Sequence, residues 1–469
     1  MKLFAIVLLL LLHSFSYGQP DCDCTQELDF VAEFYEKNLP SYPSTVDGDP
    51  SAYEAMRDSL HKKSSDITSI DNCLRLLMHY VEYFNDKHSS ISMSSESNYT
   101  HNADTALSKE MRTKLHPDSL AKFPLEDIRG LYRVAGNSPF EIAIVSGNHG
   151  PGSYQGRIVN SQTDAIADGK LLIELQRNSR GNYDVVTYNS NGSISYLSDF
   201  HYKNGDLEGR AFKKETGRTK SHVFSSEQKT YAKVLNDSVA YLRVHTFNKA
   251  LKKTMDSVYQ SVDSLITSKP YLVIDVRDNG GGSTGNAFPM VKYFYDSPII
   301  GARVEIYVTE NNIDYLNNLH RHLVEEGADP GSNAYLSAIT DELNRIKLAP
   351  LGSFMERAQS GDTIRLKDTP DTPRQVAILY NRNCASSCED FIYWAQQSNK
   401  TVLVGEKSSG TIGYGEVDHV YTPCYKFQLR YTRTRSSDLA KYEGVGIPPD
   451  VFLDDSTDWI DQTLEVLSQ

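Results

Sequence analysis

A serine at the start of a predicted helix is the residue of this sequence best placed to act as a nucleophile. Ser386 follows an apolar run that ends at Tyr380 and precedes a helical pattern over Glu389–Gln397. Together with Glu389 it forms a capping box, in which a serine and a glutamate satisfy the first N–H groups of a helix. The free N–H groups and positive dipole end of a helix also stabilise an oxyanion. The pattern therefore indicates either an ordinary helix cap or a nucleophile, and no general base lies nearby in the sequence.

Three consecutive glycines follow a second apolar run. Tyr271–Val276 is typical of a buried strand, and Gly280–Gly282 come shortly after it. Ligands of open parallel sheets bind beyond the carboxyl ends of the strands, and a glycine lets a backbone N–H approach a ligand closely because it has no Cβ. A flexible turn between strand and helix explains these glycines equally well.

A G-x-S-x-G string over Gly281–Gly285 makes Ser283 a second candidate nucleophile. In an α/β-hydrolase the elbow serine follows its strand almost directly, whereas Arg277–Gly280 lie between the strand and this string. An esterase that uses Ser283 is therefore the weaker hypothesis. A phosphate-binding loop is weaker still, because no Gly-Lys-Ser/Thr follows the glycines.

The first 18 residues have the features of a cleaved export signal. Lys2 precedes an apolar run over Leu3–Leu12, which is shorter than the roughly 20 residues that span a bilayer. Ser16 and Gly18 supply the small residues of a cleavage site, so we expect the mature chain to begin at Gln19. No later stretch has the length and apolar character of a membrane helix. We therefore expect a secreted or periplasmic protein without stable membrane insertion.

Export changes the interpretation of the cysteines. An even number survives the predicted cleavage, which favours disulfides in an oxidising compartment but does not fix their pairing. A zinc site is the alternative, but it lacks a second closely spaced ligand pair, and we expect no metal. The six cysteines are Cys22, Cys24, Cys73, Cys384, Cys388 and Cys424.

The charge of the chain argues against nucleic acid as a partner. Lys and Arg number 48 against 61 Asp and Glu, which gives a net charge of −13. A polyanion would be repelled by this field unless the chain had a dense basic cluster, which the sequence lacks. With 39% hydrophobic and 23% charged residues, the composition is that of an ordinary globular protein.

Three regions of the chain must position these residues, and their hydrophobic patterns differ. After the signal, residues 19–124 show apolar residues at helical spacing and predict a helical region. Residues 125–230 alternate in short stretches between turns and predict a β-rich domain. In residues 231–469 strands alternate with helices, which predicts an α/β core with a mainly parallel sheet. Residues 311–366 read as a helical insertion into this core.

Four segments of the last region resemble the C-terminal-processing (tail-specific) serine peptidases, in the order found in that family. That family also includes the tricorn core protease and interphotoreceptor retinoid-binding protein. The segments are Tyr271–Gly282, Val376–Tyr380 with Ala385–Phe391, Val402–Glu406, and Tyr442–Asp450. The resemblance implies a crotonase/ClpP-like α/β core, hydrolysis of peptide bonds in a polypeptide substrate, and no cofactor.

The resemblance also assigns roles to individual residues. Ser386 matches the family's nucleophile, and the backbone N–H groups of Ser387 and of Gly280 or Gly281 match its oxyanion hole. The bacterial processing peptidases use a lysine as base, but Thr411 stands at that position here. A Ser–Lys dyad is therefore not supported.

The tricorn-like branch uses a histidine from the N-terminal region instead. The segment Asp86–Ser89 resembles the element that carries it, which implies that His88 is the base. Glu443 matches the supporting acid, with Glu406 and Glu416 as alternatives. A neutral imidazole deprotonates a serine near pH 7, and a carboxylate stabilises the imidazolium that forms.

The sequence thus predicts an exported serine endopeptidase with a Ser-His-Glu site. Two alternatives stay open: a non-catalytic ligand- or peptide-binding protein on the same fold, and the esterase that uses Ser283. The domain that binds C-terminal tails in bacterial processing peptidases has no evident counterpart, because the β-rich segment occupies its place.

Overall fold

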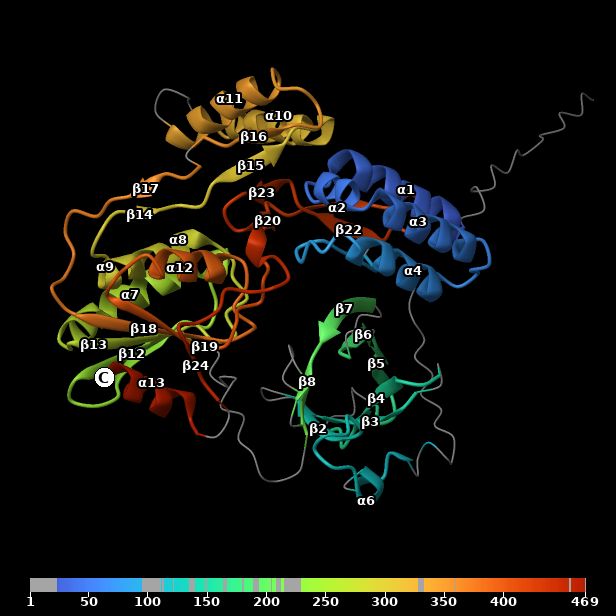
Figure 1. Ribbon diagram of the computed structural model, residues 1–469, viewed down its shortest axis with the longest axis horizontal. Coiled ribbons are helices and arrows are strands. Elements are labelled where there is room, and N and C mark those ends of the chain that lie inside the picture. Colours follow the sequence, from blue (N-terminus) through green and yellow to red (C-terminus); the bar gives the residue numbers. More distant parts are fainter. Residues whose placement is uncertain are drawn as a thin grey trace, which may run out of the picture.

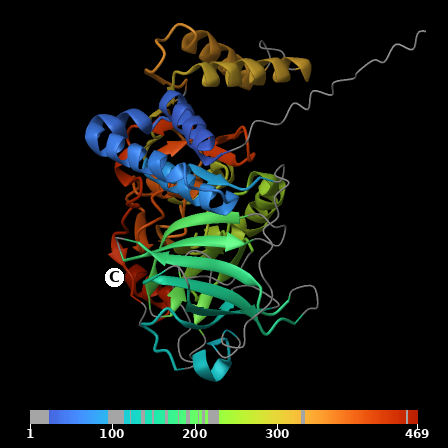
Figure 2. The same cartoon turned by 90° about the vertical axis from the view of Figure 1, so that its right-hand side faces the viewer.

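The computed structural model shows the arrangement in Figures 1 and 2. It describes residues 23–94, 111, 114–120, 122–134, 140–147, 150–162, 167–178, 181–188, 194–203, 205–207, 212–214, 229–327, 333–358, 360–454 and 457–468. The predicted export signal and Cys22 lie outside the described residues. Within these ranges, no helix combines the length and the apolar character needed to cross a bilayer.

A six-stranded sheet forms the α/β core and confirms the predicted fold class. Its order is β11-β12-β13-β18-β19-β24. Only the pair β11–β12 is antiparallel, and every other pair is parallel. The strands are β11 (Tyr231–Val234), β12 (Val239–Arg243), β13 (Tyr271–Asp275), β18 (Gln375–Tyr380), β19 (Thr401–Gly405) and β24 (Val451–Phe452).

Helices cover both faces of this sheet, which explains why its strands are almost continuously apolar. One face packs against α7 (Lys252–Thr267), η1 (Lys249–Leu251), α8 (Thr284–Ala287), η2 (Phe288–Met290), α9 (Val291–Phe294) and α12 (Ser387–Ala395). The other face packs against the last helix, α13 (Trp459–Leu467), through Trp459 and Leu467. Figure 1 shows the sheet between these layers.

The helical N-terminal region predicted from the sequence is present. It contains α1 (Cys24–Asn38), α2 (Tyr42–Gly48), α3 (Pro50–Ser64) and α4 (Ile70–Glu82), followed by β1 (Ser90–Ser92). A disulfide between Cys24 and Cys73 joins α1 to α4.

This region shares a sheet with the C-terminal part of the chain. Strand β1 pairs with β22 (Gln428–Tyr431), which pairs with β21 (Asp418–Tyr421). Ile91 lies opposite Leu429, and both are buried. The pairing holds the turn between α4 and β1 against the C-terminal part of the chain, although more than 300 residues separate the two strands along the chain.

The middle of the chain forms a nine-stranded antiparallel sheet, as Figure 2 shows in green and teal. Its strands fall within the segment for which the sequence predicts β structure. The elements are α6 (Pro117–Leu120), β2 (Gly130–Val134), β3 (Glu141–Ser146), β4 (Ser153–Val159), β5 (Leu171–Arg177), β6 (Tyr183–Tyr188), β7 (Ile194–Phe200), β8 (Tyr202–Lys203), β9 (Asp206–Leu207) and β10 (Phe212–Lys214).

The segment predicted as a helical insertion, residues 311–366, contains two helices and two short strands, and further short elements lie outside it. A four-stranded sheet, β16-β15-β23-β20, links it to the segment that follows β19. The elements are β14 (Ile299–Ile300), β15 (Val304–Tyr307), α10 (Glu310–Glu325), α11 (Ala334–Ile346), β16 (Phe354–Glu356), β17 (Thr363–Ile364), β20 (Tyr414–Gly415), β23 (Thr434–Ser436) and η3 (Ala440–Tyr442).

Candidate active site

The predicted nucleophile occupies a strained turn between a strand and a helix. Strand β18 ends at Tyr380, and α12 begins at Ser387, so Ser386 is the residue immediately before the helix. Its backbone has φ 56° and ψ −125°, a conformation that non-glycine residues rarely adopt. Such strain persists only where surrounding contacts enforce it, and it clusters at functional sites. The side chain is half-buried.

A disulfide encloses this turn. Cys384 and Cys388 are bonded to each other, and both are fully buried. The zinc alternative is therefore wrong for these cysteines, because neither has a free thiolate. Cys424 forms no disulfide with the other described cysteines, and its Sγ lies 3.4 Å from Gln26 Oε1. No cluster of potential metal ligands is found within the described ranges.

The glycine turn lies directly against the nucleophile. A Cβ on Gly281 would be 2.5 Å from the Ala385 carbonyl oxygen and 2.9 Å from Ser386 Cβ, so no other residue fits there. The N–H of Gly281 donates to Asn279 Oδ1 at 3.0 Å. Gly280 is exposed, and Ser387 supplies the first N–H of α12. These are the backbone groups predicted for the oxyanion hole.

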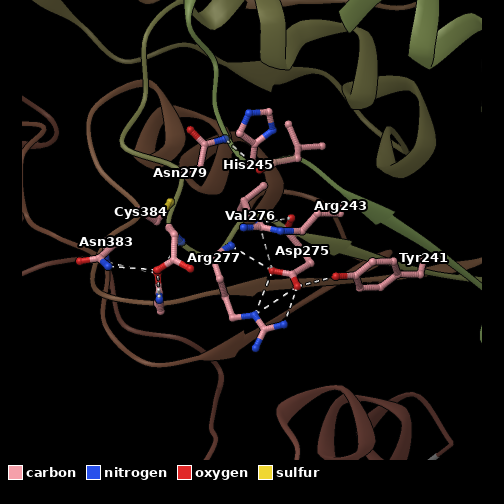
Figure 3. Close-up of polar contacts among 12 residues, drawn as sticks. Tyr241, Arg243, His245, Asp275, Val276, Arg277, Asn279, Asn383 and Cys384 are labelled. Carbon is pink, nitrogen blue, oxygen red and sulfur yellow. Dashed lines mark hydrogen bonds and ion pairs between the residues drawn. The ribbon is translucent and has the colours of Figure 1, made fainter. Parts of the chain in front are cut away.

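A buried ion pair braces the strand end that precedes the glycines (Figure 3). Arg277 Nη2 donates to Asp275 Oδ2 at 2.6 Å, and the Tyr241 hydroxyl donates to the same oxygen at 2.7 Å. Burial alone would raise the pKa of Asp275, but the two neighbouring arginines hold it below its usual value. This ion pair was not predicted from the sequence, although the Asp-Val-Arg string at the end of the strand places its two charged residues close together.

A second histidine also lies at this edge of the sheet. His245 follows β12 and lies beside Asn279 in Figure 3. Its Nδ1 is 3.3 Å from Thr230 Oγ1, and burial lowers its pKa. It has no counterpart among the residues that the sequence singles out.

The predicted base occupies the turn between α4 and β1. Asp86 organises this turn: its Oδ1 accepts from the backbone N–H of His88 at 3.0 Å. Its Oδ2 accepts from the hydroxyls of Ser89 at 2.9 Å and Thr432 at 2.6 Å. Because Thr432 follows β22, the carboxylate ties the His88 turn to the C-terminal part of the chain.

The surroundings of His88 favour a neutral ring near pH 7. Burial lowers the pKa of His88, the charge of Asp86 opposes this effect, and Arg430 adds to it. The Nδ1 atom is buried without a hydrogen-bond partner, and the backbone of Tyr414 lies near the ring and favours its charged form. A neutral imidazole is the form that accepts a proton from a hydroxyl.

Glu443 lies beside the His88 turn and contacts its backbone. The Oε1 atom accepts from the N–H of Lys87 at 2.8 Å. The Oε2 atom accepts from the N–H groups of Ile412 at 2.9 Å and Gly413 at 2.6 Å. Burial and the nearby charge of Asp86 raise the pKa of Glu443 to about 8.

The two alternative acids are engaged elsewhere. Glu406 accepts from Arg382 Nε at 2.8 Å. Glu416 is exposed and accepts from Arg357 Nη1 at 2.9 Å. Of the three glutamates, only Glu443 is bonded to the His88 turn.

Residues 408–414, which we call the strap, connect the serine to the histidine. The Thr411 carbonyl accepts from the N–H of Ser386 at 3.1 Å, and the backbone of Tyr414 lies near the His88 ring and raises its pKa. Three residues of chain span at most about 11 Å, so the serine turn and His88 both lie beside one short segment. In this described region, the Ser386 hydroxyl and the His88 ring are not hydrogen-bonded to each other. Catalytic hydrogen bonds are often long in unliganded enzymes and shorten in the complex.

Ser283, the alternative nucleophile, has an ordinary environment. Its backbone is extended, with φ −126° and ψ 126°, and its N–H donates to the Phe247 carbonyl at 2.9 Å. The helix that follows has only four residues. The strained geometry of a nucleophile elbow is found at Ser386 and not at Ser283.

Comparison with known proteins matches this architecture. The profile of peptidase family S41 matches residues 238–453. The crystal structure of mature CPAF is 12% identical over 95% of this chain and 96% of its own, with a TM-score of 0.56. Mature CPAF complexed with lactacystin is also 12% identical, over 95% of this chain and 97% of its own, with a TM-score of 0.52.

The family match contains both the glycine turn and the serine turn, and the structural matches extend the shared fold to the N-terminal region. Together with the mainly parallel sheet, they confirm the resemblance to the C-terminal-processing peptidases. The region of residues 238–453, which is just under half of the chain, matches peptidase family S41, and the protein is a serine-type peptidase.

Proposed function

We propose that the protein is an exported serine endopeptidase in which Ser386 is the nucleophile and His88 the general base. The observation that carries this proposal is the backbone of Ser386, with φ 56° at a helix N-terminus beside Gly281. The strained backbone places Ser386 next to the free backbone N–H groups at the start of α12. The absence of a lysine at position 411 leaves a histidine as the base.

The reaction follows from these placements. The Ser386 hydroxyl attacks the scissile carbonyl while His88 takes its proton. The tetrahedral oxyanion accepts hydrogen bonds from the N–H of Ser387 and from that of Gly280 or Gly281. The Gly281 N–H donates to Asn279 Oδ1 in this structure, so it must leave that partner to serve the oxyanion. His88 then gives the proton to the leaving amine, and an acyl-enzyme is left on Ser386. A water molecule, deprotonated by His88, hydrolyses this ester and restores the serine.

Glu443 supports the base by fixing the turn that carries it. Its bond to the N–H of Lys87 holds the residue before His88, and its bonds to Ile412 and Gly413 hold the strap. With a pKa raised to about 8, Glu443 is largely uncharged near pH 7, so its role is to hold the turn rather than to offset the charge of the imidazolium.

Export is part of the proposal. The support is the sequence of residues 1–18, together with two disulfides, which persist in oxidising compartments. We propose a secreted or periplasmic location with polypeptide substrates.

Labelling with a fluorophosphonate, an irreversible serine-directed probe, tests the proposal between pH 6 and 9. We expect the wild-type protein and Ser283→Ala to be labelled, and Ser386→Ala to remain unlabelled. Labelling that depends on Ser283 would support the esterase. A wild-type protein that stays unlabelled and cleaves no peptide would support a binding protein on this fold.

A further inference from the structure

We infer that Glu389 is a positioning residue for the reaction, because its carboxylate fixes the strap against the nucleophile turn. This inference rests on the proposed function of Ser386. Glu389 lies in the first turn of α12 and is fully buried. The capping-box pattern explains only one of its contacts, the bond from the N–H of Ser386 to Oε2 at 3.0 Å.

The remaining contacts of Glu389 are with the strap. Its Oε1 accepts from the Ser408 hydroxyl at 2.6 Å and from the N–H of Gly410 at 2.8 Å. Its Oε2 also accepts from the N–H of Thr411 at 2.8 Å. Each oxygen therefore accepts from two donors, and a helix cap alone requires none of the strap donors.

The two buried glutamates divide the strap between them. Four consecutive N–H groups, from Gly410 to Gly413, donate to carboxylates: the first two to Glu389 and the last two to Glu443. Glu389 also bonds the backbone of the nucleophile, and Glu443 also bonds the turn of the base. The strap thus sets the relative position of Ser386 and His88. Glu389 fixes its end near Ser386, and Glu443 fixes its end near His88.

This arrangement predicts a specific effect of Glu389→Gln. In either orientation the amide replaces one oxygen by an NH2 group, which faces two donors and accepts from neither. We then expect the strap to move away from the nucleophile turn where the hydrogen bonds to the replaced oxygen are lost. Because misplacement by about 1 Å costs about 100-fold in rate, we expect kcat for a peptide substrate to fall by about 10- to 100-fold, with KM within a factor of about three.

Glu27→Gln is the matched control. Glu27 is fully buried and accepts backbone N–H bonds from Cys424, at 3.1 Å, and from Tyr425, far along the chain from it. Both bonds go to Oε1, and Oε2 is buried without a hydrogen-bond partner, so a glutamine keeps these bonds with its carbonyl oxygen. We expect this control for the loss of a buried carboxylate to leave kcat per folded molecule unchanged.

The experiment measures kcat, KM, the rate constant of fluorophosphonate labelling, and the melting temperature. A lower kcat and slower labelling in Glu389→Gln, without such losses in Glu27→Gln, support the inference. Wild-type rates in a folded Glu389→Gln protein overturn it and leave the nucleophile assignment intact. Labelling that survives in Ser386→Ala overturns the proposed function itself.

Ser408→Ala keeps the test decisive if Glu389→Gln does not fold. The substitution removes one donor to Oε1 and the acceptor of the Ile447 N–H, at 2.7 Å, but leaves the carboxylate in place. We expect kcat to fall about threefold to tenfold with a small change in KM. A folded Ser408→Ala protein with wild-type kcat contradicts the role assigned to the strap.

Discussion

At the scale of single residues, the site depends on environment more than on residue type. The chain has 13 histidines, but His88 combines a lowered pKa with a turn held by Asp86 and Glu443. Likewise, Ser386 and Ser283 each precede a helix, and only Ser386 has a strained backbone. This difference in backbone geometry favours Ser386 over Ser283 as the proposed nucleophile.

The pH profile tests the assigned electrostatics of His88. The ring must be neutral to accept a proton, and its pKa lies below the ordinary value of 6.5. We therefore expect kcat/KM to rise with pH, with a midpoint below about 6.5, and to reach a plateau near neutrality. Besides burial, the groups that set this midpoint are Asp86 on the same turn, Arg430 on β22 and the backbone of Tyr414.

Asp86→Asn moves this midpoint in a defined direction. The charge of Asp86 raises the pKa of His88, so its removal lowers that pKa further, and the acid limb shifts to lower pH. The profile of kcat/KM against pH measures the shift. A midpoint that stays unchanged, or that moves to higher pH, contradicts the assignment of His88 as the titrating base.

Substitution of His88 distinguishes it from the other candidates for the general base. General-base catalysis contributes about 10²- to 10⁴-fold, and we expect His88→Ala to lose kcat by this factor. His245→Ala is the matched control, because that histidine is also half-buried with a lowered pKa. Thr411 contacts the nucleophile turn through its backbone, so Thr411→Ala should also change kcat little. A larger loss in either control shows that the base has been misassigned.

At the scale of elements, the serine turn is fixed by parts that the sequence reveals unequally. Strand β18, helix α12 and the glycine turn could be predicted, because apolar runs and glycines mark them. The disulfide between Cys384 and Cys388 could not be assigned, since six cysteines permit fifteen pairings. The hydrogen bonds of the strap could not be predicted either, because its bonds to Glu389 and Glu443 join residues far apart in the chain.

The two disulfides should contribute differently to stability and rate. Their sequence separations are 49 for Cys24–Cys73 and 4 for Cys384–Cys388. A disulfide stabilises mainly by restricting the unfolded chain, more so for longer loops. We expect Cys24→Ser with Cys73→Ser to lower the free energy of unfolding by about 2–4 kcal/mol and to spare kcat.

Cys384→Ser with Cys388→Ser should show the opposite pattern. The small loop stabilises less, but it encloses Ser386, so the nucleophile turn loses a constraint and kcat falls. Urea unfolding and peptide hydrolysis measure the two effects. Equal losses of kcat in both double variants would contradict a special role for the disulfide at the serine.

At the scale of the whole molecule, the proposed site combines three segments that are remote in sequence. The helical N-terminal region supplies His88, the glycine and serine turns come from the α/β core, and Glu443 follows the four-stranded sheet. The strand pair β1–β22 brings the first of these to the others. Sequence patterns identified the regions but not this pairing, because a three-residue strand has almost no periodicity of its own.

Ile91→Ala tests whether this pairing supports catalysis. Ile91 is buried in β1 opposite Leu429, and truncation of a buried isoleucine to alanine costs about 2–5 kcal/mol. We expect lower stability and, because the His88 turn loosens, a lower kcat at temperatures well below unfolding. Ile144→Ala is the control, since Ile144 is buried in the β-rich sheet away from the site. An equal loss of kcat in both folded variants would contradict the special role of the pairing.

The most direct test of the account is a crystal structure of the protein after reaction with a peptidyl phosphonate. We predict phosphorus bonded to Ser386 Oγ, its oxygen within hydrogen-bond distance of the Ser387 N–H and of a glycine N–H, and a His88 ring nitrogen about 2.6–3.2 Å from Oγ or the leaving-group oxygen. Phosphorus on another residue, or a His88 ring turned away from the adduct, would contradict the proposed site.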